Sequence, residues 1–442
     1  MLVEPVLRDH QKQTVDFQLQ VPRGFNTSDP GTGKTLSTLM GFINHPKATR
    51  MLVVAPLTIL GPSWGGDITK FTNLSYAIAH GSPAKRLAAF ESNAKVVLIN
   101  HDGVNWLAEN LQLLRDFSHG TCDEFTAFKH HTTKRSKKMG PIVNAIEHWQ
   151  FLSGTPTSNT ILDFWYPAYL LDKGERLGPQ FYRFRDQMCK AEQMSNNPLH
   201  KRWVDRDGAE ALVADALRDI TIRFKFEECV DIPPNTVSTV ELDMPANIRK
   251  QYHVLMEEEV LLTDDGTVNA INAGAKVKKA LQLLSGAVYD INGEVLKIHQ
   301  ERYDLVMQLV EERNQCLVAF NWKHELAAFL EIAKKAKIAY GEIHGGIKPT
   351  ARLAVVDAFQ AGELKVIFAH PQSAAHGLTL TKGTTTIWAS PTYDAEHYKQ
   401  FNQRIYRTGQ TERTETIRIA YKDSKELEVY ERMDGKFHRM ED

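Results

Sequence analysis

The sequence predicts an α/β protein with two lobes, each built on a largely parallel sheet. Short apolar, β-rich runs recur along the chain, and helical patterns separate them. A chain of 442 residues also exceeds one ordinary core, because domains average about 150 residues. The runs form two sets, each sufficient for one sheet, and the paired prolines of Asp231–Asn235 interrupt regular structure between them. We therefore expect lobes at residues 1–235 and 236–442.

The individual elements follow from the same patterns. Apolar runs predict first-lobe strands over Met51–Ala55, Val96–Ile99 and, less regularly, Trp149–Leu152. They predict second-lobe strands over Cys316–Phe320, Val366–Ala369, Thr385–Ala389 and Thr416–Ala420. Helical spacing of apolar residues predicts helices over His324–Ala336 and Ala351–Phe359. Residues 162–215 and 246–312 are expected to be mostly helical insertions or covers, one in each lobe.

Composition excludes several protein classes. With 42% hydrophobic and 24% charged residues, the chain is typical of soluble globular proteins, and no window holds the roughly 18 apolar residues of a membrane span. The N-terminal residues lack the apolar core of a signal peptide. The cysteines include no CxxC pair, which argues against a zinc site and favours a reducing cytosol. Because the formal net charge is −1, any contact with nucleic acid must come from local patches.

One segment, Ser28–Thr35, has the features of a phosphate-binding loop. Its glycines allow backbone amides to turn toward anionic oxygens, and the helix expected to begin near Lys34 adds the positive end of its dipole. Lys34 adds a full charge, and the Thr35 hydroxyl can ligate Mg²⁺. A strict pattern has glycine where this chain has Ser28. The alternative explanation is a chance Gly-Thr-Gly-Lys-Thr string in a loop.

A phosphate loop needs a carboxylate for the metal and a base for water, and Asp123-Glu124 offers both. Such a pair alone is usually a solvated surface feature. Its position between the phosphate loop and Ser153-Gly154-Thr155-Pro156 favours the catalytic interpretation. The preceding residues 115–122 are mostly polar, whereas a buried parallel strand normally has a continuous apolar run. The strand that would carry Asp123 is therefore poorly marked in the sequence.

The order of the motifs resembles that of superfamily 2 helicase-like ATPases of the Swi/Snf type, and most of all their short phage-encoded forms. The resemblance covers nearly the whole chain. In the first lobe it rests on Leu7–Gln11, Asp29–Thr35, Ala55–Thr58 with Trp64, Ile99–Asp102, Asp123-Glu124 and Leu152–Pro156. In the second lobe it rests on His344–Gly346 with Arg352 and Phe359, on Ser373–Leu380 and on Gln400–Gln410. The residues after Glu124 depart from the DEAD and DEAH boxes.

The resemblance implies two RecA-like lobes in tandem with an ATP cleft between them. It implies ATP and Mg²⁺ as ligands, with Thr35 and Asp123 on the metal. Lys34 would hold the phosphates, and Glu124 would activate water. The other residues expected to bind the nucleotide are Gln11, Asp29, Gly31, Thr32, Gly33 and Gln400. The residues expected to contact nucleic acid are Pro56, Thr58, Asn100 and Ser373, and those expected to couple the nucleotide to that track are Ser153, Thr155 and Gly377.

Two arginines in the last motif are candidates for transition-state stabilisation. Arg404 and Arg407 are three residues apart, so on a helix they would share one face and present two guanidinium groups together. The resemblance implies that they reach the phosphates bound by the first lobe, a role worth roughly 10³ to 10⁵ in rate. Without the upstream motifs, salt-bridged surface arginines would be the better interpretation.

Two further segments are candidates for nucleic-acid contact. Lys129–Lys138 is rich in basic residues, including Lys134 and Arg135, and either a flexible solvated loop or a phosphate-binding surface would explain it. Phe181–Arg185 interleaves aromatic residues with arginines, a mixture that can stack bases or clamp phosphates. Packing of a helical insertion onto its lobe is the commoner reason for such a string.

Together these features predict a DNA-stimulated ATPase that moves along duplex or branched DNA in replication, recombination or repair. A strand-separating helicase for DNA or RNA is the first alternative, and the departure from the DEAD box weighs against an RNA enzyme. A nucleic-acid-binding adaptor that uses ATP only as a conformational switch is the second. A metabolic phosphate-loop kinase would leave the second lobe unexplained. We expect a cytoplasmic location (the bacterial host's, if phage-encoded), no membrane contact, and a protein partner for targeting.

Overall fold

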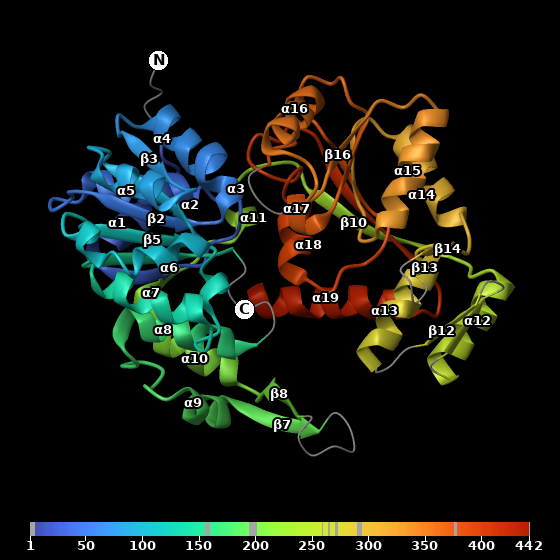
Figure 1. Cartoon of the computed structure of the whole chain (residues 1–442), viewed down its shortest axis with the longest axis horizontal. Coiled ribbons are helices and arrows are strands. Elements are labelled where there is room, and N and C mark those ends of the chain that lie inside the picture. Colours follow the sequence, from blue (N-terminus) through green and yellow to red (C-terminus); the bar gives the residue numbers. More distant parts are fainter. Residues whose placement is uncertain are drawn as a thin grey trace. The chain divides into compact units, whose positions relative to one another are not determined.

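The computed structural model describes residues 5–154, 160–193, 201–258, 260–263, 266–269, 273–289, 294–374 and 378–441. Contacts within the chain divide it into two units, one running to Asp231 and the other covering Ile232–His438 (Figure 1). Each unit is built on its own parallel sheet. The prediction of an α/β protein with two parallel-sheet lobes is thus confirmed. Among the described helices, none has the length and apolar character needed to cross a membrane.

The first sheet has seven strands in the order β3-β4-β2-β5-β6-β1-β9, and all neighbours are parallel. The strands are β1 (Arg23–Asn26), β2 (Met51–Ala55), β3 (Tyr76–Ala79), β4 (Val96–Asn100), β5 (His119–Asp123), β6 (His148–Leu152) and β9 (Thr221–Ile222). The helices are α1 (Asp9–Gln20), α2 (Lys34–Asn44), α3 (Leu57–Ile59), α4 (Gly66–Phe71), α5 (Pro83–Glu91), α6 (Val104–Leu107), α7 (Lys134–Asn144), α8 (Trp165–Asp172), α9 (Phe181–Met188), α10 (Ala209–Leu217) and α11 (Phe226–Cys229).

Alternate residues of the central strands enter two separate cores, one on each face of this sheet. Leu52 and Val54 of β2 lie in the core that contains Trp149 of β6. Val53, between them, lies in the core that contains Leu39 of α2. Both faces are therefore covered, which explains why β2 and β4 are continuous apolar runs.

Strand β5 forms although its sequence is mostly polar. Gly120, Thr121 and Cys122 are buried, and the Thr121 hydroxyl donates a 2.9 Å hydrogen bond to the carbonyl oxygen of Gln150 on β6. Gly120 is the register partner of Trp149, whose fully buried indole occupies the space where a side chain of residue 120 would lie. Small side chains with internal partners therefore replace the apolar run expected of a central strand.

The second sheet has six parallel strands in the order β10-β19-β18-β15-β17-β16. They are β10 (Asn235–Leu242), β15 (Cys316–Ala319), β16 (Tyr340–Ile343), β17 (Val366–Ala369), β18 (Thr385–Trp388) and β19 (Thr414–Tyr421). The helices are α12 (Ala246–Glu258), α13 (Ala273–Leu284), α14 (Glu301–Glu312), α15 (Lys323–Lys335), α16 (Pro349–Gln360), α17 (Pro371–Ala374), α18 (Ala395–Asn402) and α19 (Lys425–Glu441). The sequence prediction missed β10 and β16, which lie at the two edges of the sheet. The residues of β10 are exposed or half-buried, and those of β16 alternate between half-buried and buried.

Both segments expected to be mostly helical also contain antiparallel strand pairs. These are β7 (Cys189–Gln193) with β8 (Lys201–Asp205), β11 (Val260–Thr263) with β12 (Gly266–Asn269), and β13 (Ala287–Tyr289) with β14 (Val295–Lys297). Helix α14 differs from the expectation in another way. Its residues Val306 and Val310 lie in the same core as Val318 of β15, so α14 belongs to the second core and not to an insertion.

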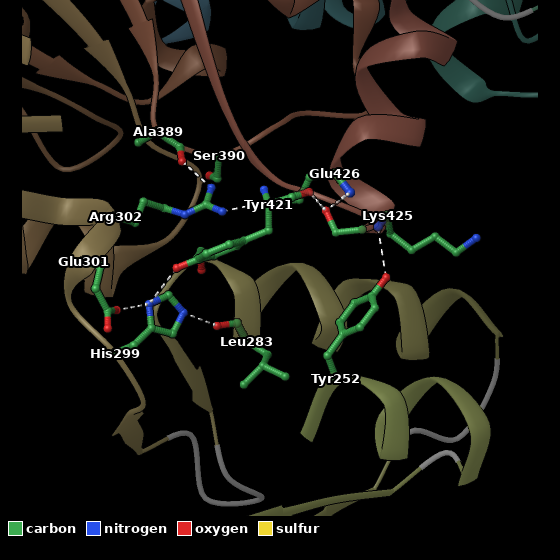
Figure 2. Close-up of polar contacts among 12 residues, drawn as sticks. Tyr252, Leu283, His299, Glu301, Arg302, Ala389, Ser390, Tyr421, Lys425 and Glu426 are labelled. Atoms are coloured by element: carbon green, nitrogen blue, oxygen red, sulfur yellow. Dashed lines mark hydrogen bonds and ion pairs between the residues drawn. The ribbon is translucent and has the colours of Figure 1, made fainter. Parts of the chain in front are cut away.

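A buried ion pair connects α14 with α19 (Figure 2). Arg302 Nη2 donates a 2.6 Å hydrogen bond to Glu426 Oε2, and both side chains are 0% exposed. Arg302 Nη1 also donates to the carbonyl oxygen of Ala389 at 2.7 Å. The same Glu426 oxygen accepts the Tyr421 amide at 3.0 Å. The pair therefore ties two helices to the residues at the ends of β18 and β19.

Gly120→Ala should destabilise the first unit, because the new Cβ atom would lie 2.1 Å from Cζ3 of the buried Trp149 ring. We expect a loss of about 1–3 kcal/mol in the free energy of unfolding, measured by urea denaturation with tryptophan fluorescence. Gly140→Ala in α7 is the matched control, since its Cβ atom would lie 3.6 Å from Leu170, an ordinary contact distance. Equal stability of the two variants would contradict the described packing of β5 on β6.

Arg302→Met should destabilise the second unit, because it leaves the buried carboxylate of Glu426 without its counter-ion. The expected loss is about 3–5 kcal/mol in the free energy of unfolding, measured by the same denaturation. Lys335→Met is the control, because Lys335 pairs with Glu331 at the surface, where the two side chains are 75% and 54% exposed and the pair contributes about 1 kcal/mol or less. If both variants lost the same amount, the Arg302–Glu426 pair would not stabilise the unit as described.

Candidate active site

The predicted phosphate loop lies between β1 and α2. Gly31 has a φ of 85° and Gly33 a φ of 83°, conformations that glycine adopts without a steric cost. A Cβ atom on Gly33 would meet Gln11 Nε2 at 2.2 Å, and one on Gly31 would meet the Phe226 ring at 2.9 Å. The positive φ angles therefore favour glycine at both positions, and the Phe226 ring also leaves little space for a side chain at Gly31.

Residues distant in the sequence hold this loop from two sides. His10 Nε2 on α1 lies 2.8 Å from the carbonyl oxygen of Thr32, and Gln11 Nε2 donates to the same oxygen at 3.4 Å. On the other side, Asp29 Oδ2 accepts the amide of Phe226 at 3.1 Å. The sequence assigned Gln11 and Asp29 to nucleotide binding, and in the structure both make contacts that support the loop. His10 has the same role, and its only signal in the sequence is its place beside Gln11.

Ser28 stands where a strict phosphate loop has glycine. Its amide donates to Asn26 Oδ1 at 3.1 Å, and its hydroxyl oxygen accepts the Phe224 amide at 3.1 Å. Because Ser28 is buried, an unpaired hydroxyl there would be costly. The segment after β9 supplies the partner, so the structure accommodates the departure from the strict pattern.

Lys34 and Thr35 begin α2. Lys34 Nζ donates to the carbonyl oxygens of Ser28 at 2.6 Å and of Asp29 at 3.1 Å, so its ammonium group lies within the curve of the loop. Thr35 is half-buried in the first turn of the helix. The charge of Lys34 and the N-terminus of α2 together make this loop attractive to a phosphate group.

Asp123 ends β5, and its carboxylate is held in one orientation. Burial raises the pKa of Asp123, and the nearby charge of Lys34 opposes this effect. One carboxylate oxygen accepts the indole N–H of the buried Trp64 at 3.0 Å, and the other accepts the Glu124 amide at 3.1 Å. A cation stabilises a buried carboxylate of this kind. The oxygens of Asp123 and of the Thr35 hydroxyl are donors that suit Mg²⁺, so the residues present fit this ion.

Glu124 has a φ of 53°, in the left-handed region that residues other than glycine rarely adopt. Such a conformation persists only where the surroundings impose it. Ser153, directly after β6, donates a 3.3 Å hydrogen bond from its hydroxyl to Glu124 Oε2. The structure thus brings Glu124 together with one of the predicted coupling residues. Thr155 and Gly377, the other two, lie outside the described residues.

His101, which lies within a matched motif but was assigned no role from the sequence, supports the turn between Asp123 and Glu124. His101 Nε2 lies 2.9 Å from the carbonyl oxygen of Asp123. Burial lowers the pKa of His101 to about 4, so at neutral pH the ring is uncharged and donates one hydrogen bond to this carbonyl. The only sequence signal was the position of His101 after Asn100 in a matched motif.

Arg404 and Arg407 do not lie on a helical face, in contrast to the expectation, because α18 ends at Asn402 and both residues follow in turns. Their guanidinium groups nevertheless donate hydrogen bonds to the same carbonyl oxygen. Arg404 Nη1 donates to the carbonyl oxygen of Leu378 at 3.2 Å, and Arg407 Nη1 donates to the same oxygen at 2.8 Å. The buried Arg404 also donates from Nε to the carbonyl oxygen of Gln400 at 2.7 Å. The fold of the chain after α18 thus gathers two positive charges.

The predicted nucleic-acid contacts fall at or just beyond the carboxyl ends of strands. Pro56 and Thr58 follow β2, and Thr58 is exposed. Asn100 ends β4 and is 6% exposed, and its Oδ1 atom has no hydrogen-bond partner in the described part of the chain. Ser373 is half-buried in α17, which follows β17 in the second unit. The first three residues therefore share one edge of the first sheet.

Internal contacts hold much of the basic segment 129–138. Lys129 pairs with Asp163 at 2.9 Å, and Arg135 Nη2 donates to the carbonyl oxygen of Ala127 at 2.9 Å. Helix α7 begins at Lys134, whose side chain is exposed. The interpretation as a flexible loop is therefore wrong from Lys134 onward.

Segment Phe181–Arg185 forms the first part of α9. The Phe181 ring lies 4.3 Å from the His131 ring, and Phe184 is buried. The Arg185 guanidinium lies 3.7 Å from the centre of the Trp203 ring. These contacts favour the packing explanation for this string over a role in binding bases.

Two family models match the chain. The SNF2-related domain matches residues 10–287, and the helicase conserved C-terminal domain matches residues 301–411. The resemblance noted from the motifs is thus confirmed over both units.

Individual proteins are similar to most of this chain. Protein p41 of Acyrthosiphon pisum secondary endosymbiont phage 1 is 28% identical over 92% of this chain and 89% of its own length. The human DNA annealing helicase and endonuclease ZRANB3 is 26% identical over 90% of this chain, which spans only 37% of that protein. The SWI2/SNF2 ATPase core of Sulfolobus solfataricus, solved in complex with dsDNA, is 18% identical with a TM-score of 0.46, covering 97% of this chain and 91% of that one. Because the SNF2-related model alone matches well over half of the sequence, the chain belongs to the SNF2-related family and is a helicase-type, nucleic-acid-stimulated ATPase.

Proposed function

We propose that this protein is an ATP-driven motor that moves along duplex or branched DNA and serves DNA replication, recombination or repair. The observation that carries the proposal is the convergence of three chemical groups at the carboxyl edge of one sheet. These are the ammonium group of Lys34, the oriented carboxylate of Asp123, and the carboxylate of Glu124 held by Ser153. Lys34 begins α2, which follows β1, both carboxylates lie at the end of β5, and Ser153 follows β6. These three strands are neighbours in the sheet.

The reaction assigned to this edge is hydrolysis of ATP to ADP and phosphate. Lys34 and the first amides of α2 bind the phosphates. Glu124 orients a water molecule toward the γ-phosphorus and accepts a proton from it, while the bond from that phosphorus to the oxygen of ADP breaks. Asp123 and Thr35 would hold Mg²⁺, which would neutralise phosphate charge. Ser153 keeps the Glu124 carboxylate in place, which links the base to β6.

Arg404 and Arg407 are assigned to the transition state of the same reaction. Two guanidinium groups that share the Leu378 carbonyl present several N–H donors within a small region. Such donors stabilise the charge that spreads over the transferred phosphoryl oxygens. Gln400, whose backbone carbonyl accepts the hydrogen bond from Arg404 Nε, is assigned to the nucleotide as well.

DNA contact is assigned to residues at the strand ends and on α7. They are Pro56, Thr58, Asn100, Ser373 and the exposed Lys134, with Arg135 in a supporting position because of its internal hydrogen bonds. Contacts of this kind are made to the sugar-phosphate backbone, so they predict weak sequence preference and a strong dependence on salt. The human relative is named as a DNA annealing helicase, which supports DNA as the polymer.

Steady-state ATP hydrolysis should be stimulated most by duplex or forked DNA. We would compare no nucleic acid, single-stranded DNA, duplex DNA, forked DNA and RNA at low salt, and then raise the salt, which should reduce the stimulation because backbone contacts release counter-ions. Displacement of a triplex strand without separation of the duplex would then identify tracking. Stimulation by RNA alone would overturn the choice of polymer, and turnover that no polymer changed would favour an ATP-switched adaptor.

Three substitutions should separate the roles within the site. Lys34→Ala should weaken ATP binding, whereas Glu124→Gln should preserve binding and lower the DNA-stimulated kcat by about 10²-fold or more, because it removes the base. Arg407→Ala should lower kcat by about 10³-fold or more, again with ATP still bound. Glu91→Gln and Arg413→Ala, at exposed positions, are the matched controls and should hydrolyse ATP at the wild-type rate. Wild-type turnover in all three site variants would refute the assigned site.

A further inference from the structure

Three histidines from distant parts of the sequence meet at the amino-terminal edge of the first sheet. His45 follows the last residue of α2, His119 begins β5 and His148 begins β6. The ring centres lie 4.6 Å apart for His45 and His119, 4.2 Å for His45 and His148, and 4.6 Å for His119 and His148. One nitrogen from each ring lies within 4.8 Å of the other two. Because β5 and β6 are parallel, this edge is the one opposite to Asp123 and Ser153, and the proposed ATPase does not use it.

The hydrogen bonds around these rings leave nitrogen lone pairs available. Ser118 Oγ lies 2.8 Å from His119 Nδ1 and accepts the Thr49 amide at 2.9 Å. A hydroxyl oxygen has two lone pairs, so it can also accept a hydrogen bond from His119 Nδ1–H, which leaves the ring lone pair on Nε2. For His148, neither ring nitrogen has a hydrogen-bond partner in the described part of the chain. Buried polar atoms without partners are uncommon and call for an explanation.

A fourth group lies beside the rings. At 3.7 Å from His148 Nε2, the carboxylate of Glu147 adds an oxygen with a negative charge.

We propose that His45, His119 and His148 form a binding site for a single Zn²⁺ or a chemically similar divalent transition-metal ion, with Glu147 or water as the fourth ligand. Imidazole is a preferred ligand of these ions, and three histidines with one further ligand give the tetrahedral set that Zn²⁺ favours. The His119 and His148 rings are stacked, with 12° between their planes, whereas an imidazole nitrogen binds an ion in the plane of its ring. Because ligand atoms in such a site lie about 3.3 Å apart, binding requires one of these rings to rotate about its Cβ–Cγ bond as well as to move inward. The Ser118 hydroxyl would orient His119 as an outer-shell partner.

Binding of an ion costs one hydrogen bond at His45. Its Nδ1 atom accepts the Lys47 amide at 3.2 Å, and a neutral ring has a single lone pair, so this hydrogen bond is given up whichever nitrogen binds the ion. The cost is small because Lys47 is exposed and water can replace the lost acceptor. A bound ion would connect the end of α2 to the beginnings of β5 and β6, the three elements that carry Lys34, Asp123 and Ser153 at or next to their other ends. The site is therefore expected to stabilise the first unit.

The test compares the wild-type chain with His45→Gln, His148→Gln and a control, His80→Gln, whose histidine is exposed and outside the cluster. Each protein is stripped with a chelator, loaded with Zn²⁺, passed over a desalting column and assayed for metal by mass spectrometry. Thermal unfolding is then recorded with and without Zn²⁺, and Co²⁺ replaces Zn²⁺ to give a visible absorption spectrum that reports ligand geometry. His45 lies beyond the helix end, so its variant keeps the test valid even where His148→Gln folds poorly.

We expect one equivalent of zinc on the wild-type chain and on His80→Gln, with a rise of a few degrees in the unfolding temperature because the ion binds the folded state. His45→Gln and His148→Gln should bind zinc at least tenfold more weakly and show no such rise. Failure of the wild-type chain to retain zinc would overturn the proposal. Equal retention by all four proteins would overturn it too, because the ion would then be bound elsewhere.

Discussion

The parallel register of β1, β6 and β5 is the constraint on which the candidate site depends. Leu152 of β6 is the register partner of Asp123 on β5 and of Asn26 on β1. The three strands therefore end level with one another, and the residues that follow them lie at the same edge of the sheet. A slip of one residue would turn Gly120 away from Trp149 and drive a larger side chain into the indole. The packing of a glycine against a buried tryptophan thus helps to place the carboxylates beside the phosphate loop.

The conformation of the phosphate loop depends on contacts with residues outside it. The carbonyl oxygen of Thr32 receives hydrogen bonds from α1, and the Asp29 carboxylate accepts the amide of Phe226, the first residue of α11. A glycine-rich loop has little conformational preference of its own, so these distant contacts supply the order that glycine lacks. The same logic accounts for Ser28, because its hydroxyl is satisfied by the Phe224 amide.

In the second unit, charged side chains hold distant elements together. Arg302 and Glu426 are buried together where α14, α19 and the ends of two strands meet. A buried pair of this kind adds little net stability but strongly penalises arrangements that separate the two groups. In the same unit, the Leu378 carbonyl gathers Arg404 and Arg407 after α18 has ended. Both features position charge through hydrogen bonds to backbone oxygens, which depend on the fold and not on helical spacing.

The apolar central strands, the two-lobe organisation and, through the order of the motifs, the family could all be predicted from the sequence. They leave recognisable signals, because a buried parallel strand is usually apolar and a phosphate loop contains glycine and lysine. Features that depend on partners far along the chain came from the tertiary structure alone. It made the polar β5 a central strand, ended α18 before Arg404, gave Arg135 internal hydrogen bonds, and brought His45, His119 and His148 together. Such contacts join residues that no spacing rule relates, so their energetic effect appears only once the chain has folded.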